Sequence, residues 1–158
     1  MASSTTKKAL VRRFDRESLA GYVNPYSYLQ LNGIELLLAD GNIVSVPYAD
    51  IKTLAFVRDF ESTAETPRTF NTRPKMDGLW VRFEFRDGDV LEGILPNNLL
   101  QVESYGFLAI PPNPVRDQRI FIPRTALRSV AVLGVVGSPL NRRKEKPAPK
   151  EQIGLFEG

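Results

Sequence analysis

The chain has 158 residues, with 21 basic and 18 acidic side chains and neither histidine nor cysteine. This length and a hydrophobic content of 42% suit one globular domain, or two very small ones that share a core. Without imidazole or thiol groups there is no Ser-His-Asp or Cys-His nucleophile, no His/Cys zinc site and no disulfide, so the sequence predicts a protein that is not an enzyme and needs no metal or other cofactor.

The termini and the apolar runs indicate where the protein resides. The N-terminal residues 1–8 are polar and are not followed by the apolar segment of a secretory signal. The longest apolar run, residues 130–136, is far shorter than the roughly 20 residues that a membrane-spanning helix needs. We therefore expect a cytoplasmic protein with no membrane contact.

Residues 7–57 are predicted to form five short strands. Segments rich in β-branched and aromatic residues are separated by turn formers, such as Asp15 and the Asp40-Gly41-Asn42 run. Gly21 is expected to mark a bend in the second strand, and Pro47 to end the fourth, because proline cannot donate to a β-ladder. One helical turn is expected near residue 50. The strands are expected near residues 10–14, 34–38, 43–46 and 52–57, with a return strand that reaches Gly21 after the first of them.

Residues 79–133 repeat this pattern in the same order. Residues 11–23 align with 83–95, residues 33–37 with 106–110, and residues 46–57 with 122–133, at offsets of 72, 73 and 76. Three ordered matches predict an internal duplication. Residues 58–78 would then be a linker, and residues 134–158 a flexible basic, proline-rich tail. The second set of strands is expected near residues 80–85, 106–110, 119–122 and 128–133, with a return strand that reaches Gly93 and a helical turn at 124–126.

Five bent strands in about 50 residues describe a small β-barrel. We therefore predict an all-β protein made of two tandem five-stranded barrels of the SH3 or Sm type. The second copy carries an x-G-x-x-L-x-G hairpin at residues 87–93 and a closing strand pair at residues 119–130. In these features it resembles the Sm-like barrels of the Hfq family of bacterial RNA chaperones, and residues 9–57 resemble them more faintly. The tandem arrangement also resembles an uncharacterised family of bacterial proteins, which implies no activity.

The Hfq resemblance implies an RNA-binding face between the fourth and fifth strands. Where those proteins carry a Tyr-Lys-His run, this chain has Pro47-Tyr48-Ala49 in one copy and Pro123-Arg124-Thr125 in the other. Single-stranded RNA needs an aromatic platform with a cation beside it. Here the aromatic Tyr48 and the cation Arg124 are divided between the copies. They would converge only if the two barrels pack with these edges together.

The distribution of charge weakens the RNA interpretation. Residues 7–57 carry six basic and five acidic side chains, and residues 79–133 carry six of each. The basic excess lies after Gly134, in the tail, whereas a backbone-binding domain usually presents a basic face on its folded part. The tail ends in a small apolar cluster that could dock on another protein. That cluster consists of Ile153, Leu155 and Phe156.

The linker holds a second group of candidate ligand-binding residues. Three cations and an aromatic residue lie within eight positions, with no acidic residue among them, and could hold a nucleotide or RNA by ion pairing and stacking. The alternative, which we favour, is a surface connection whose Phe70 packs with Trp80 on the barrels. The candidates are Arg68, Phe70, Arg73 and Lys75.

Two further functions have weaker support in the sequence. The carboxylate pairs Asp15/Glu17 and Asp87/Asp89 lie in predicted turns, where such residues usually face solvent rather than catalyse a reaction. Arg12 and Arg16 have the Arg-x-x-x-Arg spacing of PilZ-type cyclic dinucleotide receptors, but the accompanying Asp/Asn-x-Ser-x-x-Gly motif is absent at the required distance.

We therefore expect a non-enzymatic binding or scaffolding module that acts through protein–protein contacts. An Sm-like RNA-binding regulator is the alternative, and a PilZ-like cyclic dinucleotide receptor is a second alternative. Small barrels leave strand edges unpaired, and here the fourth and fifth strands of each copy are apolar. The edges are therefore expected to pair within the chain or between copies in a homo-oligomer.

Overall fold

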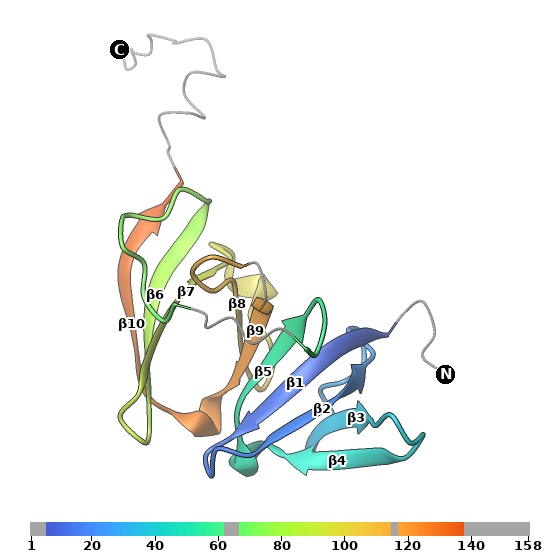
Figure 1. Ribbon diagram of the computed structural model, residues 1–158. Helices are drawn as coiled ribbons and strands as arrows, with labels where there is room; N and C mark the ends of the chain where they lie inside the picture. The colour runs from blue at the N-terminus through green and yellow to red at the C-terminus, as the bar shows by residue number, and fades with distance from the viewer. Residues whose placement is uncertain (1–5, 62–66, 115–116, 138–158) are drawn as a thin grey trace, which may run out of the picture.

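A computed structural model describes residues 6–61, 67–114 and 117–137, and this part of the chain is all-β, as predicted (Figure 1). The first half contains β1 (Lys7–Arg13), β2 (Ser18–Val23), β3 (Gly33–Leu37), β4 (Ile43–Pro47) and β5 (Ile51–Val57). The second half contains β6 (Gly78–Phe85), β7 (Val90–Leu95), β8 (Gly106–Ala109), β9 (Asp117–Pro123) and β10 (Leu127–Val136). Three short 3-10 helices are η1 (Tyr48–Asp50), η2 (Leu99–Gln101) and η3 (Arg124–Ala126).

The strands form two open antiparallel sheets rather than the two closed barrels expected from the sequence. One sheet has seven strands in the order β4-β3-β2-β1-β5-β9-β8, and the other has three in the order β10-β6-β7. The difference arises because β5 pairs with β1 on one side and with β9 of the second half on the other. Figure 1 shows β5 and β9 side by side where the two halves meet.

The same strand order occurs in both halves. In the first half the strands pair in the order β5-β1-β2-β3-β4. In the second half the equivalent strands pair in the orders β10-β6-β7 and β8-β9. A single bridge between Ile94 and Ile110 connects β7 to the end of β8. The registers also recur at the offsets found in the sequence. The equivalent pairs are Ala9↔Gly21 and Val81↔Gly93, Val11↔Leu54 and Phe83↔Val130, and Gly33↔Pro47 and Gly106↔Pro123.

Glycine is required at equivalent places because the backbones approach closely. A Cβ atom on Gly33 would lie 2.2 Å from the carbonyl oxygen of Val46, and one on Gly106 would lie 2.1 Å from that of Ile122. Gly21, predicted to mark a bend, leaves room for Leu36, whose Cγ would lie 2.7 Å from an added Cβ. The close packing of neighbouring strands therefore excludes any side chain at these positions.

Two apolar clusters form the core, and each contains residues of both halves. Phe121 of β9 is fully buried in the cluster built mainly by the first half. Ala55 and Val57 of β5 are buried in the cluster built mainly by the second half. Successive side chains of a strand point to opposite faces, so the paired β5 and β9 each contribute to both clusters.

The strand and turn predictions match the structure within a few residues, with two differences. β10 continues to Val136, beyond the end expected at residue 133. The short helix η2 at Leu99–Gln101 was not expected. The remaining two short helices, η1 and η3, lie at the predicted turns, each entered from a proline in extended conformation.

Candidate functional site

The seam between β5 and β9 is the principal contact between the two halves. Leu54 pairs with Phe121 and Ala55 with Ile120, and all four side chains are buried. The seam continues to Asp117, whose carboxylate is almost fully buried and lies 3.2 Å from the guanidinium of Arg12. These pairings show that strand edges of this chain already join by β-sheet hydrogen bonding with apolar side chains on both faces.

The two short helices that flank the seam touch each other. The hydroxyl of Thr125 in η3 donates a hydrogen bond to the carbonyl oxygen of Tyr48 in η1, at 3.1 Å. The guanidinium of Arg86 donates to the carbonyl oxygens of Ala49 and Thr125, at 2.8 and 2.9 Å. Because η1 and η3 are in contact, the candidates Tyr48 and Arg124 lie on neighbouring turns. The sequence analysis expected them to converge only if these two edges packed together.

Tyr48 and Arg124 are both engaged by other residues. The ring of Tyr48 stacks on Tyr105 with centroids 4.9 Å apart, and its hydroxyl donates to the carbonyl oxygen of Gln30 at 2.5 Å. Burial, followed by the neighbouring Tyr105, raises the pKa of Tyr48 to about 12. Arg124 is exposed and its guanidinium lies 5.3 Å from the centre of the Phe107 ring. This surface therefore holds a partly exposed aromatic pair, Tyr48 and Tyr105, and the exposed cation Arg124 on the neighbouring turn.

A pocket of about 210 Å³ lies next to this aromatic pair, and the sequence predictions did not identify it. Tyr28 lines it and is buried, and its hydroxyl has no hydrogen-bond partner among the described residues. Burial and then the neighbouring Glu103 raise the pKa of Tyr28. Three tyrosines between positions 22 and 28 were the available sequence signal. The lining residues are Pro25, Tyr26, Tyr28, Leu29, Glu103, Ser104 and Tyr105.

The linker candidates lie against the three-stranded sheet and share no partner with Tyr48 or Arg124 among the described residues. Phe70 packs edge to face with Trp80, and the carboxylate of Glu92 accepts hydrogen bonds from the Phe70 backbone and from the Trp80 indole. Arg73 donates to the carbonyl oxygen of Val135 at 2.6 Å, whereas Lys75 is exposed. This arrangement agrees with the favoured interpretation, in which Phe70 and Trp80 pack onto the protein.

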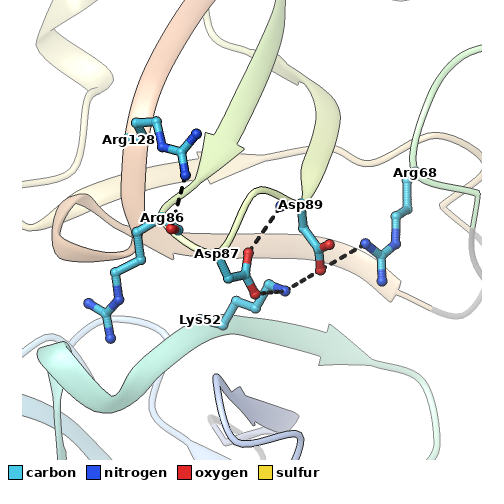
Figure 2. A network of polar contacts seen from close by, with 6 residues as sticks. All are labelled: Lys52, Arg68, Arg86, Asp87, Asp89 and Arg128. Carbon is cyan, nitrogen blue, oxygen red and sulfur yellow. Dashed lines mark hydrogen bonds and ion pairs between the residues drawn. The ribbon is translucent and has the colours of Figure 1, made fainter.

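Arg68 belongs to an ionic network at the tip of the β6–β7 hairpin (Figure 2). The ammonium of Lys52 in β5 lies 2.7 Å from the carboxylate of Asp87 and also contacts Asp89, which in turn lies 3.0 Å from Arg68. The hydrogen bond from Lys52 is the main cause that lowers the pKa of both carboxyl groups. The pair Asp87/Asp89 thus connects this hairpin to the first half.

The remaining sequence predictions concern Arg12 and the C-terminal tail. Arg12, considered for cyclic dinucleotide binding, pairs with the buried Asp117. The proposed docking residues of the tail lie outside the described part of the chain; they are Ile153, Leu155 and Phe156. Within residues 6–61, 67–114 and 117–137, no group of three or more acidic side chains is placed to hold a metal ion.

Two strands at opposite ends of the pairing order have one strand partner each in the described chain: β4 pairs with β3, and β10 with β6. Residues 128–133 of β10 are all exposed, and among them Val130 and Val132 have exposed fractions of 40% and 60%. On β4, Ile43 is 64% exposed. Edge strands that expose apolar side chains are sites where another strand can add.

No helix in the described residues has the length and apolar character needed to cross a membrane.

The comparisons with known proteins identify a family. Comparison with curated proteins and with solved structures gives no match. A family of unknown function, DUF6982, matches residues 5–134, which include every strand except the end of β10. The chain therefore belongs to DUF6982, in agreement with the expected resemblance to an uncharacterised family.

Proposed function

We propose that this protein is a non-enzymatic binding or scaffolding module that makes protein–protein contacts by strand addition at its sheet edges. The observation that carries the proposal is the contrast between β5 and β10. Residues 53–55 of β5 are buried, and Leu54 and Ala55 among them pair with β9, whereas residues 128–133 of β10, which pairs only with β6, are exposed. An exposed edge with apolar side chains gains both backbone hydrogen bonds and apolar burial when an extended segment adds to it.

We further infer that the two halves arose by duplication of one small Sm-like unit. The common strand order and the recurring registers support this inference. The close approaches at Gly33 and Gly106 are additional support, since both glycines face the strand that follows in the same register. Under this interpretation β10 is the counterpart of β5, and β4 is the counterpart of β9.

A peptide that copies β9, Asp117–Pro123, tests strand addition directly. Labelled with a fluorophore, it should bind the protein at the β10 edge and raise fluorescence anisotropy. Val132→Asp should abolish the binding, because it places a charge where the added strand would cover an apolar side chain. Leu100→Asp is the matched control, since Leu100 is 94% exposed and lies in η2 rather than on either edge. Absence of binding, or equal binding by the Val132→Asp variant, would contradict the proposal.

A second candidate function, binding of single-stranded RNA, is supported by the proximity of Tyr48 and Arg124 on neighbouring turns. The test is retention of a single-stranded RNA oligonucleotide at increasing salt. If this function holds, a Tyr48→Ala/Arg124→Ala double variant should lose binding, because bases stack on aromatic rings and phosphates need cations. An Arg73→Ala/Lys75→Ala variant then serves as the comparison for the linker. Weak binding that neither variant changes would leave the protein-contact function favoured.

A further inference from the structure

We propose that copies of this chain associate head to tail, with the β10 edge of one copy adding to the β4 edge of the next in the register that joins β5 to β9 within each chain. This inference rests on the proposed function and names a second copy of the chain as its partner. It follows from three features of the fold. These are an internal seam that serves as a template, two strands with a single strand partner each that are equivalent to those in the seam, and the apolar residues that these strands expose.

The internal seam supplies the geometry. β5 and β9 pair in antiparallel fashion, with Leu54 opposite Phe121 and Ala55 opposite Ile120. In the pairing order of the second half, β10 occupies the place of β5, and in that of the first half β4 occupies the place of β9. Each chain thus carries both components of a second seam, one on each half, and neither has a partner strand on its outer side within the described residues.

The residues that a second seam would cover are apolar on β10. Val130 stands at the position of Leu54, with exposed fractions of 40% and 0% respectively. Ala131 is exposed where Ala55 is fully buried, and Val132 is 60% exposed. Burial of such side chains is favourable because it removes apolar surface from water. The second seam would therefore repeat the burial that already stabilises the first.

The register of the second seam follows from that of the first. Equivalent positions on β4 present Val44 in place of Ile120 and the 64% exposed Ile43 in place of Arg119. Val44 is partly buried and Ile43 adds an apolar contact that the internal seam lacks. The pairs expected between two copies are Val130 with Ser45, Ala131 with Val44, and Val132 with Ile43.

One substitution makes the second seam weaker than the first. Ser45 occupies the place of Phe121, which is fully buried against Tyr28 in the internal seam. A serine buries far less apolar surface than a phenylalanine, so the contact between copies should be reversible and depend on concentration. The side chain of Arg73, bound to the carbonyl oxygen of Val135, lies beyond the positions that pair and leaves them accessible.

The two edges are different surfaces, so the contact is heterologous. A heterologous contact repeats from copy to copy and produces a ring when the rotation closes or an open assembly when it does not. This property separates the proposal from a symmetric dimer, in which one edge would pair with itself. It also means that blocking a single edge should stop growth, because each junction needs one intact edge of each kind.

The experiment uses two variants of the full chain, Val132→Asp on β10 and Ile43→Asp on β4, with Leu100→Asp as the control. All three replace side chains that are at least 60% exposed, and circular dichroism should confirm that each variant folds. Sedimentation velocity should show the wild type and the control forming species larger than the 17.7 kDa monomer as concentration rises. Each edge variant alone should remain a monomer.

Mixing the two edge variants provides the decisive measurement. The Ile43→Asp chain retains β10 and the Val132→Asp chain retains β4, so the mixture should form a 1:1 dimer of twice the monomer mass. A wild type that stays monomeric, an edge variant that still dimerises with itself, or a mixture that stays monomeric would overturn the inference. If the β9 peptide binds while the chain stays monomeric, this inference fails and the proposed function stands. If neither binding nor self-association occurs, both fail.

Discussion

The ring of Phe121 lies edge to face against the ring of Tyr28, with centroids 6.0 Å apart, although the two residues belong to different halves of the chain. Phe121 is fully buried, and Tyr28 retains 4% exposure. The contact lies directly beside the seam, where Phe121 also pairs with Leu54. The second half therefore completes the core of the first, which makes the stability of one half depend on the other.

We predict that Phe121→Ala destabilises the whole described fold by about 3–5 kcal/mol, the usual cost of removing a buried phenylalanine ring. Urea unfolding followed by tryptophan fluorescence and by circular dichroism should show one coincident transition, shifted to lower urea. Phe121→Leu, which keeps most of the apolar volume, should shift it less. Two separate transitions, of which only one responds to the substitution, would show that the halves unfold independently.

Removal of the hydroxyl group should change the free energy of unfolding differently at Tyr28 and at Tyr48. The buried Tyr28 hydroxyl has no hydrogen-bond partner among the described residues, so Tyr28→Phe should leave the free energy of unfolding unchanged or raise it by up to about 1 kcal/mol. Tyr48→Phe loses the hydrogen bond to Gln30 and should lower it by about 0.5–1.5 kcal/mol. The two variants are matched in chemistry. Equal losses of stability in both would contradict the difference in hydrogen bonding.

Alkaline pH should destabilise the fold through Tyr48. The pKa of this residue is raised from its ordinary value of 10.0 to about 12, because burial disfavours the phenolate. The resulting stability is fully present below pH 10 and is lost as the pH rises toward 12, since the unfolded chain releases its proton first. Unfolding free energies measured across this window should fall less steeply for Tyr48→Phe than for the wild type. An unchanged slope would argue against the raised pKa.

Local sequence features predicted most strands and turns. Pro47 and Pro123 precede η1 and η3, and Gly21 lies where the neighbouring strand leaves no room for a Cβ atom, because backbone geometry and side-chain size act over a few residues. The recurring register was also visible as sequence offsets. These features establish the order of strands within each half.

The pairing between β5 and β9 was foreseen only as a possibility, since it joins residues 60 to 67 positions apart. That pairing joins β9 and β8 to the five strands of the first half in one seven-stranded open sheet, because β5 uses both of its edges. It also forms the contact between η1 and η3 and so determines the proximity of Tyr48 and Arg124. Burial of Tyr28 depends on Phe121 across the seam, and no local pattern reveals it.

Alanine substitutions at glycine should destabilise the two halves similarly. Gly33→Ala and Gly106→Ala each place a Cβ within 2.2 Å of a backbone carbonyl oxygen on the neighbouring strand, so the strands must separate. We expect a loss of several kcal/mol, typical of severe overpacking. Gly134→Ala is the control, because the nearest atom would lie 3.7 Å away. Thermal unfolding of the three variants measures the effect, and a control as damaging as the others would contradict the argument from close approach.

Lys52→Met should raise the pKa values of Asp87 and Asp89 toward the ordinary 3.8, because the Lys52 hydrogen bond is the main cause of their lowering. A lowered pKa stabilises the fold at pH values above 3.8 and this stability is lost as the pH falls through the folded-state pKa. The free energies of unfolding of the wild type and the variant should therefore differ most above pH 3.8 and become equal in acid. The side chains of Asp87 and Asp89 are 35% and 41% exposed, so the difference in the free energy of unfolding should stay below about 1 kcal/mol.

Carbon NMR titration of the carboxyl groups measures both pKa values directly. Arg128→Met, which leaves Lys52 in place, is the control, and identical titration curves for Lys52→Met and the wild type would show that Lys52 does not hold these carboxylates in solution.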